Sequence, residues 1–250
     1  MPIRRLSVLL LSLLSVCAVQ AQDLASTCHA SSSYDVTLKP GSLLFDRPAP
    51  APFHVELQQG VLRSDGALVK LNAEDQDRLT LFERELRALV PRVRTVARNG
   101  VDIAAQALSQ EVAGMGLGAD TRAEFQRRLD AHAAELKRRI SVSQSTHDWQ
   151  GDAANQAMNQ IAGDLMPLLA ADLGQQAINA ALSGDLQTAA SLRDRAADLA
   201  TDLQPRLQAR MQALRPQIEA LCPSIEHLAS LQQGVRGSDG QPLNLLQVGR

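Results

Sequence analysis

The chain has 250 residues, with 25 basic and 27 acidic side chains and a formal net charge of −2 at pH 7. A chain of this balance, without a strongly basic stretch, does not favour nucleic acid or an anionic membrane surface as a partner. It contains four Phe, one Trp and one Tyr, which is few for a classical small-molecule pocket because aromatic side chains usually line such pockets. The length allows one or two domains.

The first residues predict an export signal. Two arginines precede an apolar run over residues 6–16, and a small-residue cleavage site ends at Ala21. We expect cleavage between Ala21 and Gln22, so that residues 1–21 are a cleaved signal peptide and the mature protein is periplasmic. The apolar run is shorter than the roughly 20 residues that a membrane span needs. No integral membrane anchor is therefore expected after cleavage.

Cys28 and Cys222 are the two cysteines of the expected mature chain. Exported chains meet an oxidising compartment, so an even count favours a disulfide bond between them. The alternative is a thiol pair for redox chemistry or metal binding, for which a C-x-x-C spacing would be typical. Because the two cysteines are far apart in sequence, we expect a structural disulfide.

Residues 22–71 predict a small antiparallel β unit. A proline-rich loop over 46–52 is expected between its first two strands. The tight-turn dipeptide Asp65-Gly66 precedes its last strand. Three segments carry the alternation or turn signals of strands: 36–39, 54–58 and 68–71.

From Asn72 the hydrophobic period becomes helical and continues to about Val112. Pro91 lies inside this stretch and predicts a kink. The glycine-rich stretch 114–118 then breaks the helix. We interpret it as a flexible turn and not as a phosphate-binding loop, because no strand precedes it and no Lys-Ser/Thr follows it. The apolar residues of the first helix recur at spacings of three and four, close to a heptad seam: Leu79, Phe82, Leu86, Leu89, Val93 and Val96.

Three further helices are predicted, over about 119–143, over about 152–182, and after 183–185. The last is expected to be one long helix that bends at Pro205, Pro216 and Pro223. Its apolar seam is Leu199, Leu203, Leu207, Met211, Leu214, Ile218, Leu221, Ile225 and Leu228. The predicted fold is therefore α+β and mostly helical. A small N-terminal β unit is followed by a helical domain over 72–234, whose long kinked amphipathic helices form a bundle or helical hairpins.

A ten-residue echo links two distant parts of the chain, LQQGVLRSDG at 57–66 and LQQGVRGSDG at 231–240. The sequences before the two copies do not match, so we reject a chain of two repeated modules. Each copy is expected to form a turn at its Ser-Asp-Gly and then a short strand. Residues 235–250 are accordingly predicted as a C-terminal tail or as a short strand that returns to the β unit.

Two places hold residue types that could form a site. His132 lies on the apolar face of the second predicted helix, with Glu135 as the acid one helical turn further along and no second histidine at ligand spacing. We expect a packed, hydrogen-bonded histidine there, not a metal ligand. The stretch THDWQGD at 146–152 could form a site with His147, or a capped helix start with Trp149 packed inward; we favour the helix start. No catalytic, cofactor-binding or metal residues are predicted, because the sequence lacks GxSxG, HExxH and paired ligand spacings.

Four features together resemble the YggN-like family of exported bacterial proteins. They are a cysteine soon after the cleavage site, the V-x-L-x-P strand at 36–40, the passage DGALVKLNAEDQ at 65–76 that leads into ELRALVPRV at 85–93, and a late cysteine, Cys222, in a helical region. The resemblance covers nearly the whole mature chain. It implies a periplasmic protein with a domain of unknown function and brings no catalytic residues.

These observations predict a non-enzymatic envelope protein that acts as a scaffold or binding module, with another protein or a second copy of itself as partner. One alternative is a carrier or chaperone-like binder of apolar cargo. Another is a hydrolase whose active-site residues converge only in space.

Overall fold

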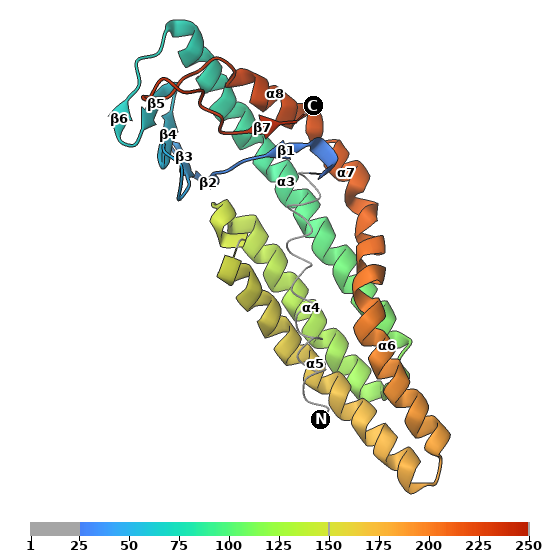
Figure 1. The fold of residues 1–250 in the computed structure, drawn as a ribbon. Helices are drawn as coiled ribbons and strands as arrows, with labels where there is room; N and C mark the ends of the chain where they lie inside the picture. The colour runs from blue at the N-terminus through green and yellow to red at the C-terminus, as the bar shows by residue number, and fades with distance from the viewer. Residues whose placement is uncertain (1–25, 150, 250) are drawn as a thin grey trace. The chain divides into compact units, whose positions relative to one another are not determined.

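The computed structural model describes residues 26–149 and 151–249. The expected signal peptide and its cleavage site between Ala21 and Gln22 lie outside this part of the chain. A short N-terminal set of strands is followed by long helices (Figure 1), which confirms the mostly helical α+β class.

Two compact units make up the chain. The sheet unit contains residues 26–97, 141–153 and 215–249, and the helical unit contains residues 98–140 and 154–214. This division differs from the linear one expected from the sequence. The reason is that helix α3 (Ala73–Ala113) contributes its first part to the sheet unit and its last part to the helical unit.

An antiparallel sheet of five strands, in the order β2-β3-β4-β5-β6, forms the centre of the sheet unit. Its strands are β2 (Asp35–Leu38), β3 (Leu43–Asp46), β4 (His54–Gln58), β5 (Val61–Ser64) and β6 (Ala67–Leu68). The sequence analysis missed β3 and β5 and extended the last strand too far. β3 reads as a short continuous apolar run, because Leu43, Leu44 and Phe45 are all buried, and such a run carries no alternation to detect.

The first turns of α3 cover this sheet. Leu79 is fully buried, and the ring of Phe82 lies 6.2 Å from the ring of Phe45 on β3, centroid to centroid. Gly60, in the β4–β5 turn, has φ +80° and lies against α3 so closely that a Cβ there would be 2.7 Å from the Gln76 carbonyl oxygen. Only glycine fits this position without displacing the helix backbone.

The C-terminal region is built from short helices and does not form the single long helix that was predicted. α6 (Leu186–Met211) ends at a 3₁₀ turn, η2 (Gln212–Leu214), and is followed by α7 (Arg215–Glu219) and α8 (Cys222–Leu231). Pro216 and Pro223 each lie in the first turn of a new helix. Proline is tolerated there because it lacks the N–H that would otherwise bond within the helix.

After α8 the chain returns to the N-terminus. β7 (Gln247–Val248) pairs antiparallel with β1 (Ala30–Ser31), in a small sheet separate from the main one. The structure therefore has a returning C-terminal strand. The tail before it is packed and not loose: Val235, Leu243 and Leu245 are all buried.

The two copies of the echo adopt different structures. The first forms β4, β5 and the turns around them, whereas the second spans the end of α8 and the turns after it. The Ser-Asp-Gly turn is common to both, since Gly66 and Gly240 have φ of +81° and +74°. The two copies thus share a turn, whereas the secondary structure of their other residues depends on the part of the fold in which each copy lies.

In the helical unit, the last part of α3 packs with α4 (Ala119–Val142), α5 (Gly151–Leu182) and α6. The apolar seam predicted for the last helix is partly confirmed in this unit, because Leu207, Met211 and Leu214 are buried. The side chains of Leu199 and Leu203, which belong to the same seam, lie outside the described residues. The core cluster is aliphatic apart from one phenylalanine: Val112, Met115, Leu117, Phe125, Leu129, Leu165, Leu169, Leu173 and Leu192.

Candidate functional site

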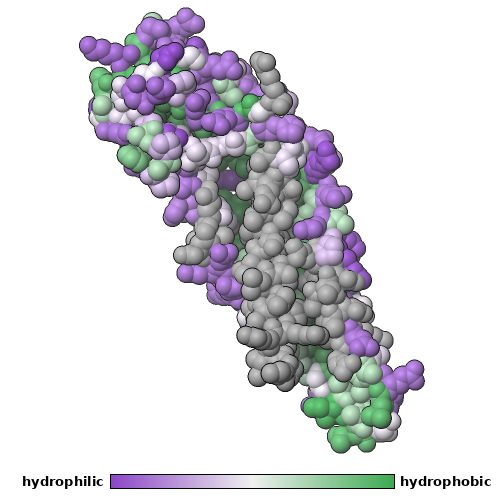
Figure 2. Space-filling view, in the orientation of Figure 1, coloured by the Kyte–Doolittle hydropathy of each residue, from purple (hydrophilic) through white to green (hydrophobic). Residues whose placement is uncertain are grey.

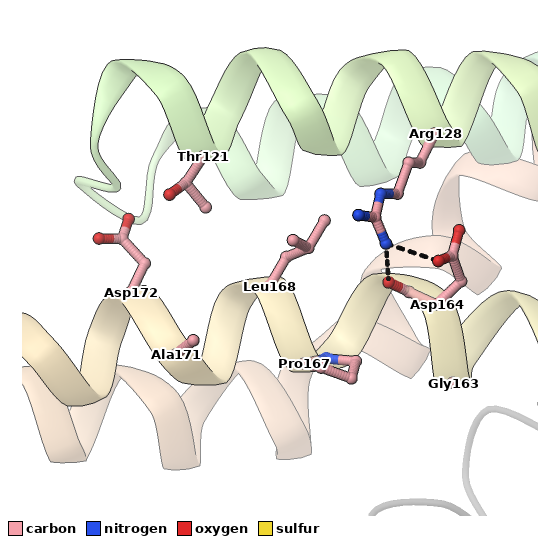
Figure 3. Close-up of a pocket in the computed structure, with 8 residues that line it drawn as sticks. All are labelled: Thr121, Arg128, Gly163, Asp164, Pro167, Leu168, Ala171 and Asp172. Carbon is pink, nitrogen blue, oxygen red and sulfur yellow. Dashed lines mark hydrogen bonds and ion pairs between the residues drawn. The ribbon is translucent and has the colours of Figure 1, made fainter.

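A pocket of about 560 Å³ opens between α4 and α5 of the helical unit. We call it the α4–α5 groove (Figure 3). Its lining comes from two helices: Thr121 and Arg128 on α4, and Gly163, Asp164, Pro167, Leu168, Ala171 and Asp172 on α5.

The hollow follows from the residues that α5 presents to it. Gly163, Pro167 and Ala171 recur every four residues, so they lie on one face of the helix. All three have short side chains and leave space that larger residues would fill. Directly beside this face, Leu165 and Leu169 are buried in the core cluster, and this packing fixes the direction in which the groove face points.

A cluster of charged side chains borders one end of the groove. Arg128 Nη1 donates to Asp164 Oδ1 at 2.6 Å, and Arg128 Nε donates to Glu124 Oε1 at 2.6 Å. His132 Nε2 lies 2.9 Å from Asp164 Oδ2. Glu124, Arg128 and His132 stand at intervals of four on α4, so they share one face of that helix. Asp164, from α5, joins this row.

These contacts keep the carboxylates ionised. The hydrogen bond with His132, and then that from Arg128, lower the pKa of Asp164 against the opposing effect of desolvation. Hydrogen bonds from Arg127 and then Arg128 lower the pKa of Glu124. A carboxyl group that is to act as a general acid near neutral pH needs the opposite shift. The cluster is therefore built as an ion-pair network between two helices.

The other end of the groove is closed by a different carboxylate. Asp172 Oδ2 accepts a hydrogen bond from the backbone N–H of Gly118 at 2.8 Å, and Gln176 Nε2 donates to the carbonyl of Gly116 at 3.3 Å. The glycine-rich stretch 114–118 is thus the turn between α3 and α4, held to α5 by side chains. The N–H of Gly118 is already bonded to Asp172, where a bound phosphate would need it free.

His132 lies where the sequence predicted, on the inward face of α4, but its partner was not predicted. Glu135, one helical turn after His132, bonds to Arg138 instead, with Arg138 Nε 2.7 Å from Glu135 Oε2. Asp164 lies 32 residues away, and no local pattern connects it to His132. Within the described residues, no group of three or more His, Cys, Asp or Glu side chains could hold a metal ion.

The THDWQGD stretch lies in the sheet unit. Thr146–Trp149 form a 3₁₀ turn, η1, at the edge of β2. Thr146 Oγ1 accepts from the N–H of Val36 at 2.9 Å and donates to Asp35, and His147 Nδ1 lies 3.3 Å from Asp35 Oδ2. Trp149 is only half-buried and donates to Ser143 Oγ. The stretch thus leads into the start of α5, as the helix-start interpretation of the sequence predicted, and it is bonded to the edge of β2.

The sheet unit also contains the disulfide. Cys28 and Cys222 are bonded, with 5.1 Å between their Cα atoms. Cys28 is almost fully buried. The bond joins the segment before β1 to the first residue of α8, next to the β1–β7 pairing, so covalent and hydrogen-bonded links fix the same two chain ends.

The fold defines the chain as a mostly helical α+β protein with an antiparallel sheet and one internal disulfide. None of the helices in the described part is long and apolar enough to cross a membrane. The chain matches a family described as "Protein of unknown function (DUF2884)" over residues 28–245, and it belongs to this family. Neither the curated proteins nor the solved structures contain a match to it.

Proposed function

We propose that this DUF2884 protein is a YggN-like, periplasmic, non-enzymatic binding module that holds a segment of a partner protein in its α4–α5 groove. One observation carries the proposal: the charged side chains that border the groove already bond to one another or to the backbone. Arg128 bonds to Asp164, and Asp172 bonds to Gly118. These pairings support a structural role for the charged side chains, which hold α4, α5 and the turn before α4 together.

The surface between these charges suits a polypeptide. Leu168 and the small residues of α5 give an apolar floor, while Arg128 and Asp172 stand at its two ends. An amphipathic helix that docks in such a groove uses apolar anchors flanked by polar contacts. Export is supported by the N-terminal sequence and by the Cys28–Cys222 bond, which is typical of an oxidising compartment.

The test is site-specific photo-crosslinking in the cell envelope. A photoreactive amino acid replaces Ala171, which is exposed within the groove. The matched control replaces Ala134, an exposed alanine of α4 that does not line the groove. We expect a discrete protein adduct from position 171 and none from position 134. Equal adducts at both positions, or turnover of a substrate by the purified protein that Arg128→Ala abolishes, would contradict the proposal.

A further inference from the structure

A compact apolar surface lies where α5 turns into α6. Ile178 and Leu182 on the last turns of α5, and Leu186 at the start of α6, are 56%, 82% and 71% exposed. Ile178 and Leu182 are four residues apart and therefore lie on one face of the helix. We call these three residues the hairpin tip. Figure 2 shows hydrophobic surface gathered at the α5–α6 turn, which Figure 1 locates.

The hairpin tip is almost free of charge. Charged residues make up 21% of the chain, so 20 residues of average composition would hold about four. Residues 173–192 hold only one, Asp185. Its carboxylate is used as a helix cap: it accepts from the N–H of Thr188 at 2.9 Å and from Thr188 Oγ1 at 2.6 Å.

The polar groups of the turn also bond inward. The N–H of Gly184 donates to Ala181, and that of Asp185 donates to Ala180 at 2.9 Å. Ser183 Oγ likewise donates to the Ala180 carbonyl at 2.9 Å. Gly184, with φ +80°, allows this closure. A segment that enters hydrocarbon must satisfy its polar groups internally, and the N–H groups of Gly184 and Asp185 and the hydroxyl of Ser183 are satisfied in this way.

The size and composition of the hairpin tip indicate which kind of partner could cover it. A second copy would need a larger surface, because each partner in a stable dimer buries about 800 Å² and three side chains fall well short of that. An unfolded polypeptide would need partners for its own backbone groups, and the bonds just described leave the turn poorly suited to supply them. An anionic surface would need basic residues, and residues 173–192 contain none.

We propose that the hairpin tip inserts Ile178, Leu182 and Leu186 into the surface of a zwitterionic phospholipid bilayer. The apolar side chains enter the boundary between headgroups and acyl chains, as amphipathic surface helices do. Asp185, whose carboxylate caps α6 by accepting from Thr188, stays at headgroup level. This contact is separate from the α4–α5 groove and does not depend on the function proposed for it.

The experiment is vesicle flotation of the purified chain with phosphatidylcholine vesicles. Wild type is compared with Leu182→Ser/Leu186→Ser, and Leu68→Ser serves as the matched control, because Leu68 is a 61% exposed leucine in the sheet unit. We expect the double variant to partition at least about tenfold more weakly, as the loss of two apolar side chains requires. The control should bind like wild type. Circular dichroism establishes that all three proteins are folded.

Three results would overturn the proposal. One is the absence of wild-type flotation. A second is equal flotation of wild type and the double variant. The third is binding that requires anionic lipid and disappears in salt, which would indicate headgroup charge as the cause. Crosslinking at Ala171 tests partner binding in the α4–α5 groove and does not depend on the hairpin tip. Failure of the membrane proposal is therefore distinguishable from failure of the proposed function.

Discussion

Gly60→Ala tests the contact between the β4–β5 turn and α3. A Cβ at position 60 would lie 2.6 Å from Thr80 Oγ1 and 2.7 Å from the Gln76 carbonyl oxygen. The side chain of Thr80 can rotate away, but the Gln76 carbonyl belongs to the helix backbone and cannot move alone. The backbone at Gly60 also has φ +80°, which costs a residue other than glycine about 1 kcal/mol.

The chain supplies a matched control for this substitution. Gly66 has φ +81°, and nothing lies within 4 Å of its would-be Cβ, so Gly66→Ala carries the backbone cost alone, about 1 kcal/mol. Gly60→Ala adds overpacking, typically about 1–3 kcal/mol. We expect it to lower the free energy of unfolding by about 2 kcal/mol more than Gly66→Ala, because the backbone cost is common to both variants and only the overpacking remains in the difference.

Urea unfolding followed by far-UV circular dichroism measures both variants under the same conditions. Adding Thr80→Ala to Gly60→Ala removes one of the two close contacts, so it should restore part of the lost stability and not all of it. Equal losses for Gly60→Ala and Gly66→Ala would refute the reasoning, because the close approach of the turn to α3 would then contribute nothing.

Three other outcomes are expected. Asp164→Asn lowers the melting temperature at pH 7. Because the pKa of Asp164 is lowered in the folded chain, its ionised form adds stability above its unfolded pKa of about 3.9, and the difference from wild type should close as the pH falls below about 4. Reducing the Cys28–Cys222 bond lowers the free energy of unfolding in urea by up to about 5 kcal/mol, because the bond closes a long loop. Gln232→Ala removes the acceptor for the N–H groups that follow Asn244, costs about 2 kcal/mol, and should speed limited proteolysis of the C-terminal segment.

The helices before residue 183 could be read closely from the sequence. Their apolar period is regular, and glycine turns end α3 and α5 near the predicted places. The last helix was predicted too long because the seam keeps its spacing through Ile218 and Ile225, and periodicity alone does not register that Pro216 and Pro223 start new helices. β3 was missed for the opposite reason, since a fully buried strand shows no alternation.

The candidate groove was only half predictable. The sequence places His132 on an apolar face, and α4 confirms that. Its partner Asp164 depends on how α4 and α5 pack, and one sequence carries no signal for a pair so distant along the chain. Gln232 is similar: its side chain bonds to the backbone of Leu245 and Leu246, a role that no pattern of glutamine predicts.

The bond between Cys28 and Cys222 makes a covalent ring of residues 28–222, which contains the whole helical unit. A mechanical load applied to the two ends of the chain would pass through this bond and not through the helical unit. Likewise, a single protease cut within the ring would leave one molecule whose pieces remain joined. Neither force on the chain ends nor a single cut within the ring therefore separates the helical unit from the two ends of the chain.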